Sequence, residues 1–331
     1  MSTTPQDSIL PSNVLPQYEL KELLGKGAFG QIYKATHNQV DVAIKIEPPS
    51  TKKQVLKVET QILKRLQDTN SPYFLQLLGF GNFEFKGKYY QYMVMNLVGQ
   101  NLSDIRKKQP FQKFSLSTSA LLLKEMILAI RDFHLAGYVH RDIKPSNFAI
   151  EKKSSNQRSR IILLDFGLAR KLIKSDGSIK SPRSDAGFRG TARYASINAH
   201  DSKDLSKVDD LWSFFYVMVE FHKGQLPWRK EKDKERIGEM KRTMTTTQLL
   251  LGMPEQTVAL LKYLKTLDYF SEPNYEYITS LFDSMFAATN EASDVLWDWE
   301  KNDMDTNSML TTEGLRGISD YPCAENLEVS L

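Results

Sequence analysis

One polar stretch in the middle of the chain, residues 140–147 with the sequence HRDIKPSN, restricts the fold and the chemistry more than any other feature. It places Asp142, Lys144 and Asn147 within six residues, and a later apolar run ends at a second carboxylate, Asp165. Transfer of a phosphoryl group to a hydroxyl needs a proton acceptor, a cation beside the moving charge, and oxygen ligands for Mg²⁺. The four side chains supply all of these, so the spacing predicts that the loop and the end of the apolar run meet at a site for phosphoryl transfer.

The loop and the tripeptide Asp165-Phe166-Gly167 together resemble the catalytic and metal-binding loops of eukaryotic protein kinases. The resemblance implies that Asp142 orients the attacking hydroxyl and accepts its proton, while Lys144 neutralises the transferred group. Asn147 and Asp165 would hold Mg²⁺. A lysine two residues after the aspartate resembles the serine/threonine branch, because tyrosine kinases usually place Ala-Ala-Arg or Arg-Ala-Ala there. The alternative is that the His-Arg-Asp tripeptide of the loop and the Asp-Phe-Gly tripeptide occur separately by chance. Their order and spacing in the chain argue against it.

A glycine-rich turn between two predicted strands contains Gly25, Gly27 and Gly30. Glycines let the backbone close over phosphates with its amide groups exposed. A dinucleotide-binding fold would place a helix directly after the turn, and a Walker-type loop would continue with Gly-Lys-Ser/Thr; neither pattern follows. On the glycines alone a purely structural hairpin remains an alternative, whereas Lys45 at the end of the hairpin favours a nucleotide site.

Apolar residues recur at helical spacing from Val55 to about Asp68, which predicts a helix with one apolar face. Glu59 lies beside that face. In isolation such a carboxylate is more often solvated than paired. With Lys45 one strand upstream, Glu59 resembles the helix glutamate that holds the phosphate-binding lysine of kinases, and we expect the two side chains to pair.

The same resemblance implies an adenine site. Met95 would be its gatekeeper, a role compatible with filling the core, and Asn96 to Val98 would form the hinge whose backbone bonds the adenine edge. Ala149 would be the small floor beneath the ring. The residues implied in nucleotide binding are Leu24, Gly25, Gly27, Gly30, Ile32, Ala43, Lys45, Met95, Asn96, Leu97, Val98 and Ala149.

The predicted fold class is α+β, a bilobal protein-kinase-like fold. Residues 18–98 would form a small lobe with an antiparallel β-sheet and one main helix, and residues 99–301 a larger, mainly helical lobe. Strands are expected over 73–81 and 88–97, and helices over 101–109, 115–136, 232–249, 255–268, 275–288 and 290–300. Residues 1–17 are expected to be a disordered leader, and residues 302–331 a flexible acidic tail.

The stretch from Gly190 to His200 lacks the Ala-Pro-Glu triplet with which most protein kinases close this segment. It resembles instead the Ser-Ile-Asn signature of the casein kinase 1 superfamily, here residues 196–198. Residues 188–191 (FRGT) and 224–230 (GQLPWRK) are most similar to the tau-tubulin kinase-like branch of that superfamily. The resemblance runs from about Tyr18 to Glu300. It implies that Asp210 is a buried carboxylate that bonds the backbone of the catalytic loop.

The net charge of +4 is unevenly distributed. Residues 302–331 carry six acidic side chains against Arg316 alone, so the tail is at −5 and residues 1–301 are at +9. Residues 166–193 hold seven basic side chains against two acidic ones. The basic residues of 223–242 are expected on a solvated helix face.

Positive charge beside a substrate groove leads to a hypothesis about the substrate. Arg189 and Arg193 flank Thr191, which by resemblance lines the groove and bonds Asp142 or Lys144. We therefore expect a preference for acidic or phosphorylated serine/threonine substrates without an activating phosphate. The alternative is a switch, in which a loop serine such as Ser181 becomes phosphorylated and occupies the same arginines.

The resemblance implies a serine/threonine protein kinase that uses ATP and Mg²⁺, with protein substrates as partners. A pseudokinase-like scaffold that binds acidic or phosphorylated proteins is the alternative, although the lysine, both aspartates and the asparagine of the motifs are all present. No nucleic-acid recognition motif, signal peptide or membrane-spanning run is found, and a single cysteine, Cys323, allows no internal disulfide. We expect a cytoplasmic monomer, without excluding access to the nucleus.

Overall fold

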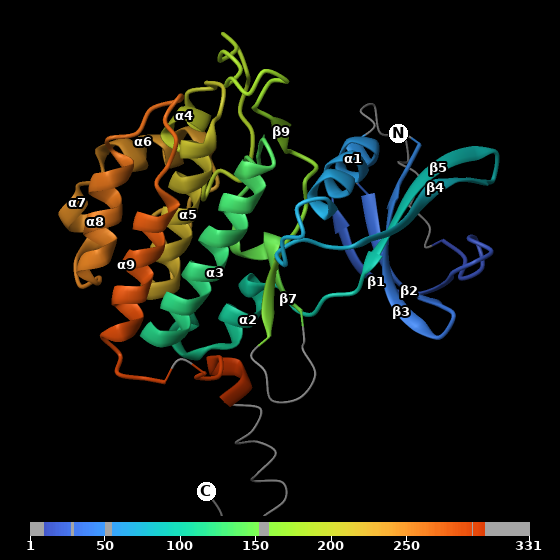
Figure 1. The fold of residues 1–331 in the computed structure, drawn as a ribbon, viewed down its shortest axis with the longest axis horizontal. Coiled ribbons are helices and arrows are strands. Elements are labelled where there is room, and N and C mark those ends of the chain that lie inside the picture. The colour runs from blue at the N-terminus through green and yellow to red at the C-terminus, as the bar shows by residue number, and fades with distance from the viewer. Residues whose placement is uncertain (1–9, 28–29, 50–54, 152–158, 293, 302–331) are drawn as a thin grey trace, which may run out of the picture.

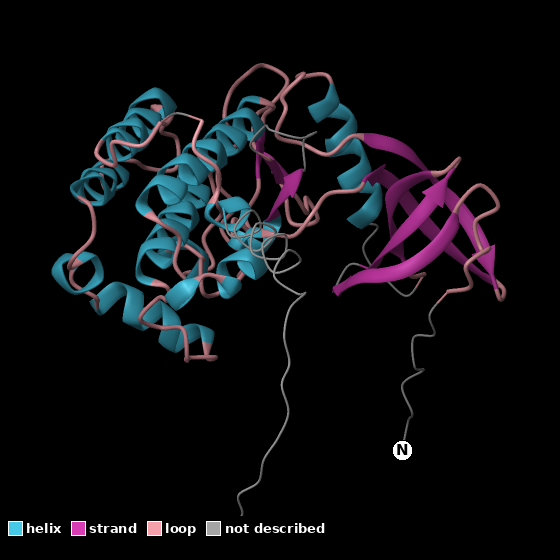
Figure 2. Ribbon diagram, turned by 90° about the horizontal axis from the view of Figure 1, so that it is seen from below, coloured by secondary structure: helices cyan, strands magenta, loops and turns pink. Residues whose placement is uncertain are grey.

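The computed structural model describes residues 10–27, 30–49, 55–151, 159–292 and 294–301. The described part of the chain forms a small lobe built on a β-sheet and a larger helical lobe, which lie side by side in Figure 1 and are seen from below in Figure 2. The predicted α+β fold class is confirmed. The acidic tail, with Cys323, lies outside the described residues, as do the first nine residues of the predicted leader.

The sheet of the small lobe is antiparallel, with strand order β1-β2-β3-β5-β4. Alternation places Tyr33 and Ala35 of the second strand in the core while their neighbours face outward. The strands are β1 (Glu19–Gly27), β2 (Gly30–His37), β3 (Val40–Glu47), β4 (Leu77–Phe85) and β5 (Lys88–Asn96). The expected start of the fourth strand at Tyr73 is wrong. The backbone there turns to the large lobe, where Tyr73 O accepts from Leu163 N at 2.8 Å.

Helix α1 (Val55–Gln67) packs its apolar face, including Leu56, Ile62 and Leu63, into the core. Its first N–H groups have a partner at the end of β3, since the Glu47 carboxylate accepts from Val55 N at 3.1 Å and from Leu56 N at 3.3 Å. The unpaired amides of the helix start are thereby satisfied, and α1 is fixed to the strand that carries Lys45.

The large lobe surrounds the long helix α3 (Leu116–Leu135) and the buried helix α5 (Lys207–Lys223). Two short antiparallel ribbons carry the polar loops to the face toward the small lobe. The first pairs β6 (Tyr138–Val139) with β9 (Arg170–Lys171), and the second pairs β7 (Phe148–Glu151) with β8 (Arg160–Leu163). The other helices are α2 (Leu102–Lys108), α4 (Ile197–His200), α6 (Lys234–Thr243), α7 (Thr246–Leu250), α8 (Glu255–Leu264) and α9 (Tyr275–Ala287), with 3-10 turns at Pro110–Gln112 and Pro145–Asn147.

Two of the expected helices differ from the structure. The helix expected over 232–249 is divided into α6 and α7, because Met244 is extended and Thr245 caps the second helix through a capping box with Gln248. The segment expected as a helix over 290–300 has only a short helical turn, at 298–301. Its backbone is held by tertiary contacts instead, among them Asp298 N, which donates to Thr118 Oγ1 at 3.2 Å.

Residues 10–17, expected to belong to a disordered leader, lie against the sheet. Leu10 and Leu15 are buried with Tyr33 and Val94, so two apolar side chains of this polar segment complete the core of the small lobe. Among the described residues, no helix has the length and apolarity needed to cross a bilayer.

Candidate active site

The polar loop is fixed to the large lobe by Asp210 of α5. Its carboxylate accepts from His140 N and from Arg141 N, each at 2.7 Å, and lies 2.8 Å from Nε2 of His134. Burial alone would raise the pKa of Asp210, but the bond from His134 and the charges of the two histidines hold that pKa below its ordinary value. Arg141 has a positive φ of 67°, and the bond from its N–H to Asp210 stabilises this less favourable backbone conformation.

Two predicted residues contact the Asp142 carboxylate, and a third contacts its backbone oxygen. Lys144 Nζ donates to Asp142 Oδ2 at 2.6 Å, and Thr191 Oγ1 donates to Oδ1 at 2.7 Å. Lys144 also donates to the Thr191 hydroxyl at 3.1 Å. The Asn147 side-chain amide donates to Asp142 O at 2.9 Å, which leaves its carbonyl oxygen available as an acceptor. Both expected partners of Thr191 are therefore present.

A second group of charges joins the two lobes. Lys45 Nζ of β3 donates to Glu59 Oε2 at 2.6 Å and to Asp165 Oδ1 at 3.5 Å. The other oxygen of Glu59 accepts from Phe166 N at 3.2 Å. Burial would lower the pKa of Lys45, but the two carboxylates outweigh it and raise that pKa, while Lys45 and His140 together overcome burial and lower the pKa of Asp165. The expected pairing of Lys45 with Glu59 is observed.

The predicted nucleotide residues lie on β1, β2, β3, β5 and β7 and directly after β5. At the β1–β2 turn, a side chain added to Gly25 or Gly27 would meet open space, whereas a Cβ on Gly30 would lie 2.3 Å from Ile46 O. Only glycine fits at position 30, where φ is +139°. Ala43 pairs with Met95 across β3 and β5, and both are buried, as is Ala149 on β7.

The hinge residues are not equivalent. Asn96 N donates to Gln76 O, its side-chain oxygen accepts from Gln76 N at 2.8 Å, and its amide donates to Glu151 at 3.1 Å. The backbone N–H and both side-chain polar atoms of Asn96 are therefore already hydrogen-bonded, to Gln76 of the small lobe and to Glu151 of the large lobe. Leu97 and Val98 directly follow the strand and are partly buried.

Comparison with protein families matches residues 18–291 to the protein kinase domain. A protein of Dictyostelium discoideum whose name describes it as a serine/threonine-protein kinase is 45% identical over 287 residues, which cover 86% of this chain and 56% of that protein. The chain belongs to the protein kinase family. A Caenorhabditis elegans protein, also named for the serine/threonine-protein kinases, is 33% identical over 86% of this chain and 82% of its own length. This kinase chain spans little more than half the length of the Dictyostelium relative.

The basic residues near the kinase groove fall into two sets. Arg170 and Arg183 both donate to the buried Asp204 carboxylate. Within the described residues, no carboxylate forms a salt bridge with Arg141, Arg189 or Arg193. Burial, and then the charges of Arg183, Arg189 and Arg170, lower the pKa of Arg141 to about 10. Residues 166–193 therefore carry a positive charge that their own carboxylates only partly balance.

Sequence reasoning missed two charged residues of this region. Asp204 follows no motif, and its role depends on a fold that brings it to Arg170 and Arg183. Lys241 belongs to the stretch expected on a solvated helix face, yet it is buried, and its Nζ donates to the carbonyls of Ala192 and Ala195. That expectation is wrong for Lys241, because the contact lies between segments nearly fifty positions apart.

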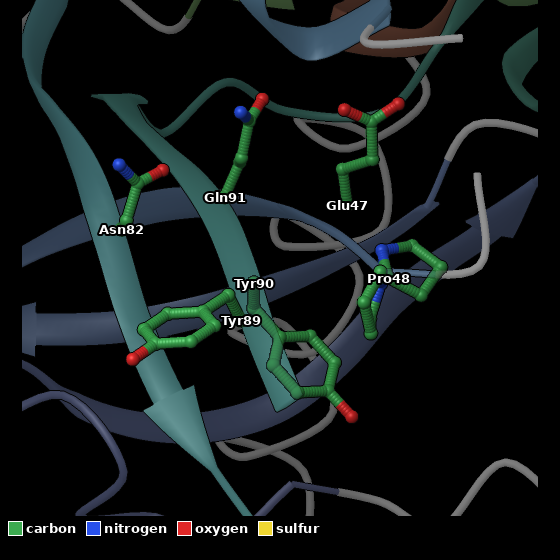
Figure 3. A pocket seen from close by; sticks show the side chains of 7 residues that line it. Glu47, Pro48, Asn82, Tyr89, Tyr90 and Gln91 are labelled. Carbon is green, nitrogen blue, oxygen red and sulfur yellow. The ribbon is translucent and has the colours of Figure 1, made fainter. Parts of the chain in front are cut away.

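A hollow of about 500 Å³ lies between the end of β3, the prolines that follow it, β4 and β5 (Figure 3). It is lined by Glu47, Pro48, Pro49, Asn82, Tyr89, Tyr90 and Gln91. None of the predicted nucleotide or metal residues borders it. Its one carboxylate already caps α1, so the hollow has no part in the chemistry described above.

Proposed function

We propose that this chain is an active serine/threonine kinase that transfers the γ-phosphoryl group of Mg-ATP to hydroxyls of protein substrates. One observation carries the proposal: Lys45 contacts Glu59 and Asp165 at once, so the lysine, the small-lobe helix and the metal carboxylate are already aligned. A scaffold that only binds would have no need to keep Lys45 and Glu59 buried as an ion pair, since burying charge is costly. The geometry therefore supports catalysis over the pseudokinase-like scaffold.

The side chains fit ATP and Mg²⁺. Asp165 and the carbonyl oxygen of Asn147 are the hard oxygen ligands that Mg²⁺ prefers, and two protein ligands leave room for phosphate oxygens and water. Bound Mg-ATP would supply the phosphoryl group and neutralise part of its charge. Lys45, held by Glu59, is placed to contact the phosphates, and the open space above Gly25 and Gly27 lets backbone amides approach them.

Asp142 would orient the substrate hydroxyl and accept its proton. Its two oxygens are held by Lys144 and Thr191, so the carboxylate is fixed before substrate arrives. Lys144 lies beside the same oxygens, where it would neutralise charge on the transferred group. The direct test is phosphorylation of a serine/threonine peptide library by the purified chain and by Asp142→Ala. Loss of product in the variant supports the proposal, and equal product from both would contradict it.

We further propose a preference for acidic or phosphorylated sites. The support is that Arg141 and Arg189, whose charges act on each other, and Arg193, two residues after Thr191, form no salt bridge with a carboxylate of the described residues. An anion would relieve the repulsion between Arg141 and Arg189, and guanidinium groups suit bidentate phosphate contacts.

The resemblance to the casein kinase 1 superfamily, and within it to the tau-tubulin kinase-like branch, remains part of this proposal. Ser196 of its Ser-Ile-Asn signature caps α4 and donates to Asp209 at 2.7 Å, so the signature has a structural role here. A cytoplasmic location and a monomeric state are proposed on the sequence alone.

A further inference from the structure

Lys241 of α6 lies beneath the loop of residues 191–195. Its Nζ donates to Ala192 O at 2.8 Å and to Ala195 O at 2.6 Å, and lies 3.3 Å from His200 Nε2. The side chain is buried. A single residue therefore contacts the loop near both of its ends, while Asp142 contacts Thr191 of the same loop.

Burying this amine has a cost that its surroundings only partly offset. No carboxylate of the described residues lies within salt-bridge distance of Lys241, and burial lowers its pKa to about 6. The rings of Tyr216 and Trp228, with centroids 4.7 and 5.2 Å from Nζ, provide weak cation–π attraction. A methionine would fill the same space without the desolvation penalty, so the contribution specific to lysine is its N–H donors.

The same loop is held at two further points. Trp228 Nε1 donates to Arg193 O at 2.8 Å, and the Tyr194 hydroxyl donates to Glu220 Oε2 at 2.7 Å. The carbonyls of Ala192, Arg193 and Ala195 and the hydroxyl of Tyr194 thus all have partners on α5, on α6 or on the segment between them, whereas Thr191 contacts the catalytic loop. Of these contacts, only those of Lys241 hold more than one carbonyl of the loop.

Helix α6 reaches the loop because it approaches α4 closely at Gly238. A Cβ at this position would lie 3.0–3.2 Å from three atoms of the His200 side chain, closer than ordinary packing allows. The glycine lets the helix lie against His200, which in turn places Lys241 under Ala192 and Ala195.

We propose that Lys241 is a positioning residue for the protein substrate: it sets the backbone of residues 191–195 in the groove without acting on the nucleotide. The inference rests on the proposed phosphotransfer at Asp142. Loss of the two donors would leave both carbonyls buried without partners, and the loop would relax. Substrate binding should weaken, whereas ATP binding, which depends on Lys45, Asn147 and Asp165, should not change.

The test compares Lys241→Met with Arg236→Met, which replaces a basic side chain at an exposed position on the same helix. For Lys241→Met we expect the KM for a peptide substrate to rise about tenfold or more, as follows from losing buried hydrogen bonds. The KM for ATP and the slow hydrolysis of ATP without peptide should stay within about twofold of the starting protein. Arg236→Met should leave all three unchanged.

Lys241→Gln provides a second variant, since it keeps one amide donor in the cavity and should give an intermediate KM for peptide. It also serves if Lys241→Met fails to fold by circular dichroism. An unchanged KM for peptide in a folded variant, or a parallel change in KM for peptide and for ATP, would overturn the inference. Absence of peptide phosphorylation by the unsubstituted chain would instead refute the proposed function, so the two failures are distinguishable.

Discussion

Asp204 binds Arg183 at two points, with Nη2 2.9 Å from Oδ1 and Nε 3.2 Å from Oδ2, and also accepts from the backbone N–H of Arg183 at 3.0 Å. The second oxygen accepts from Arg170 of β9 as well. Two arginines often bind one phosphate group in this way, but here the anion is a carboxylate of the chain itself. This carboxylate joins Arg170 and Arg183, and we expect it to order the segment between them.

If this carboxylate does the ordering, activity should survive phosphatase treatment, and Asp204→Asn should lower kcat about tenfold, because amide oxygens bind guanidinium groups weakly. A peptide phosphorylation assay before and after phosphatase is the measurement, with the exposed Asp68→Asn as the control. An inactive dephosphorylated chain would favour the switch at a loop serine such as Ser181.

The same pair predicts a pH dependence of stability. Burial would raise the pKa of Asp204, but the hydrogen bonds from Arg183 and Arg170 hold it below its ordinary value. A lowered pKa in the folded state stabilises the fold above the unfolded pKa of about 4, and this stabilisation is lost as pH falls further. Asp204→Asn should therefore lower the free energy of unfolding by roughly 1–3 kcal/mol at pH 7 and by less below about pH 4. The half-exposed side chain of Arg183 limits this loss. Urea unfolding at both pH values measures the difference, and an equal loss at each would contradict the assignment.

Glu59→Gln should lower kcat roughly 10–100-fold, because a charge-assisted hydrogen bond of about 1.5–3 kcal/mol no longer fixes Lys45. Steady-state kinetics with Mg-ATP measure the effect, and Glu84→Gln on the exposed face of β4 is the matched control. Near-normal turnover in Glu59→Gln would show that Lys45 needs no partner.

Asp165→Asn should reduce phosphotransfer by roughly 100-fold or more, since a metal carboxylate becomes a neutral amide. Calorimetric titration separates the cause from misfolding: ATP alone should still bind, while the additional affinity conferred by Mg²⁺ should be lost. Retention of that metal-dependent affinity would move the metal site away from Asp165.

Arg189→Ala combined with Arg193→Ala should raise the KM for acidic peptides roughly tenfold and leave the KM for neutral peptides nearly unchanged. The reason is that two cations that attract an acidic peptide are removed, whereas a neutral peptide has no charge for them to attract. Peptide pairs that differ only in Asp against Asn make the comparison. Equal losses on both classes would indicate a structural role for these arginines.

The sequence predicted those parts of the site whose residues lie close together in the chain or match a motif. Asp142, Lys144 and Asn147 share one loop, and Lys45 with Glu59 follow from resemblance to kinases. Asp204 and Lys241 were not predicted, because a lone carboxylate or lysine has the same local pattern whether it is solvated or buried. Likewise, the departure of the backbone near Tyr73 from the sheet is decided by a bond to Leu163 in the other lobe, which periodicity does not encode.

The two leucines ahead of the first strand have a practical consequence for anyone preparing the protein. A shortened chain that began at Tyr18, where the family match starts, would lose the apolar cover that Leu10 and Leu15 give to Tyr33 and Val94. It would also leave the Tyr33 hydroxyl without the N–H of Leu10, 3.3 Å away. Newly exposed apolar surface on a sheet promotes self-association, so such a fragment should be less soluble than one that begins ahead of Leu10.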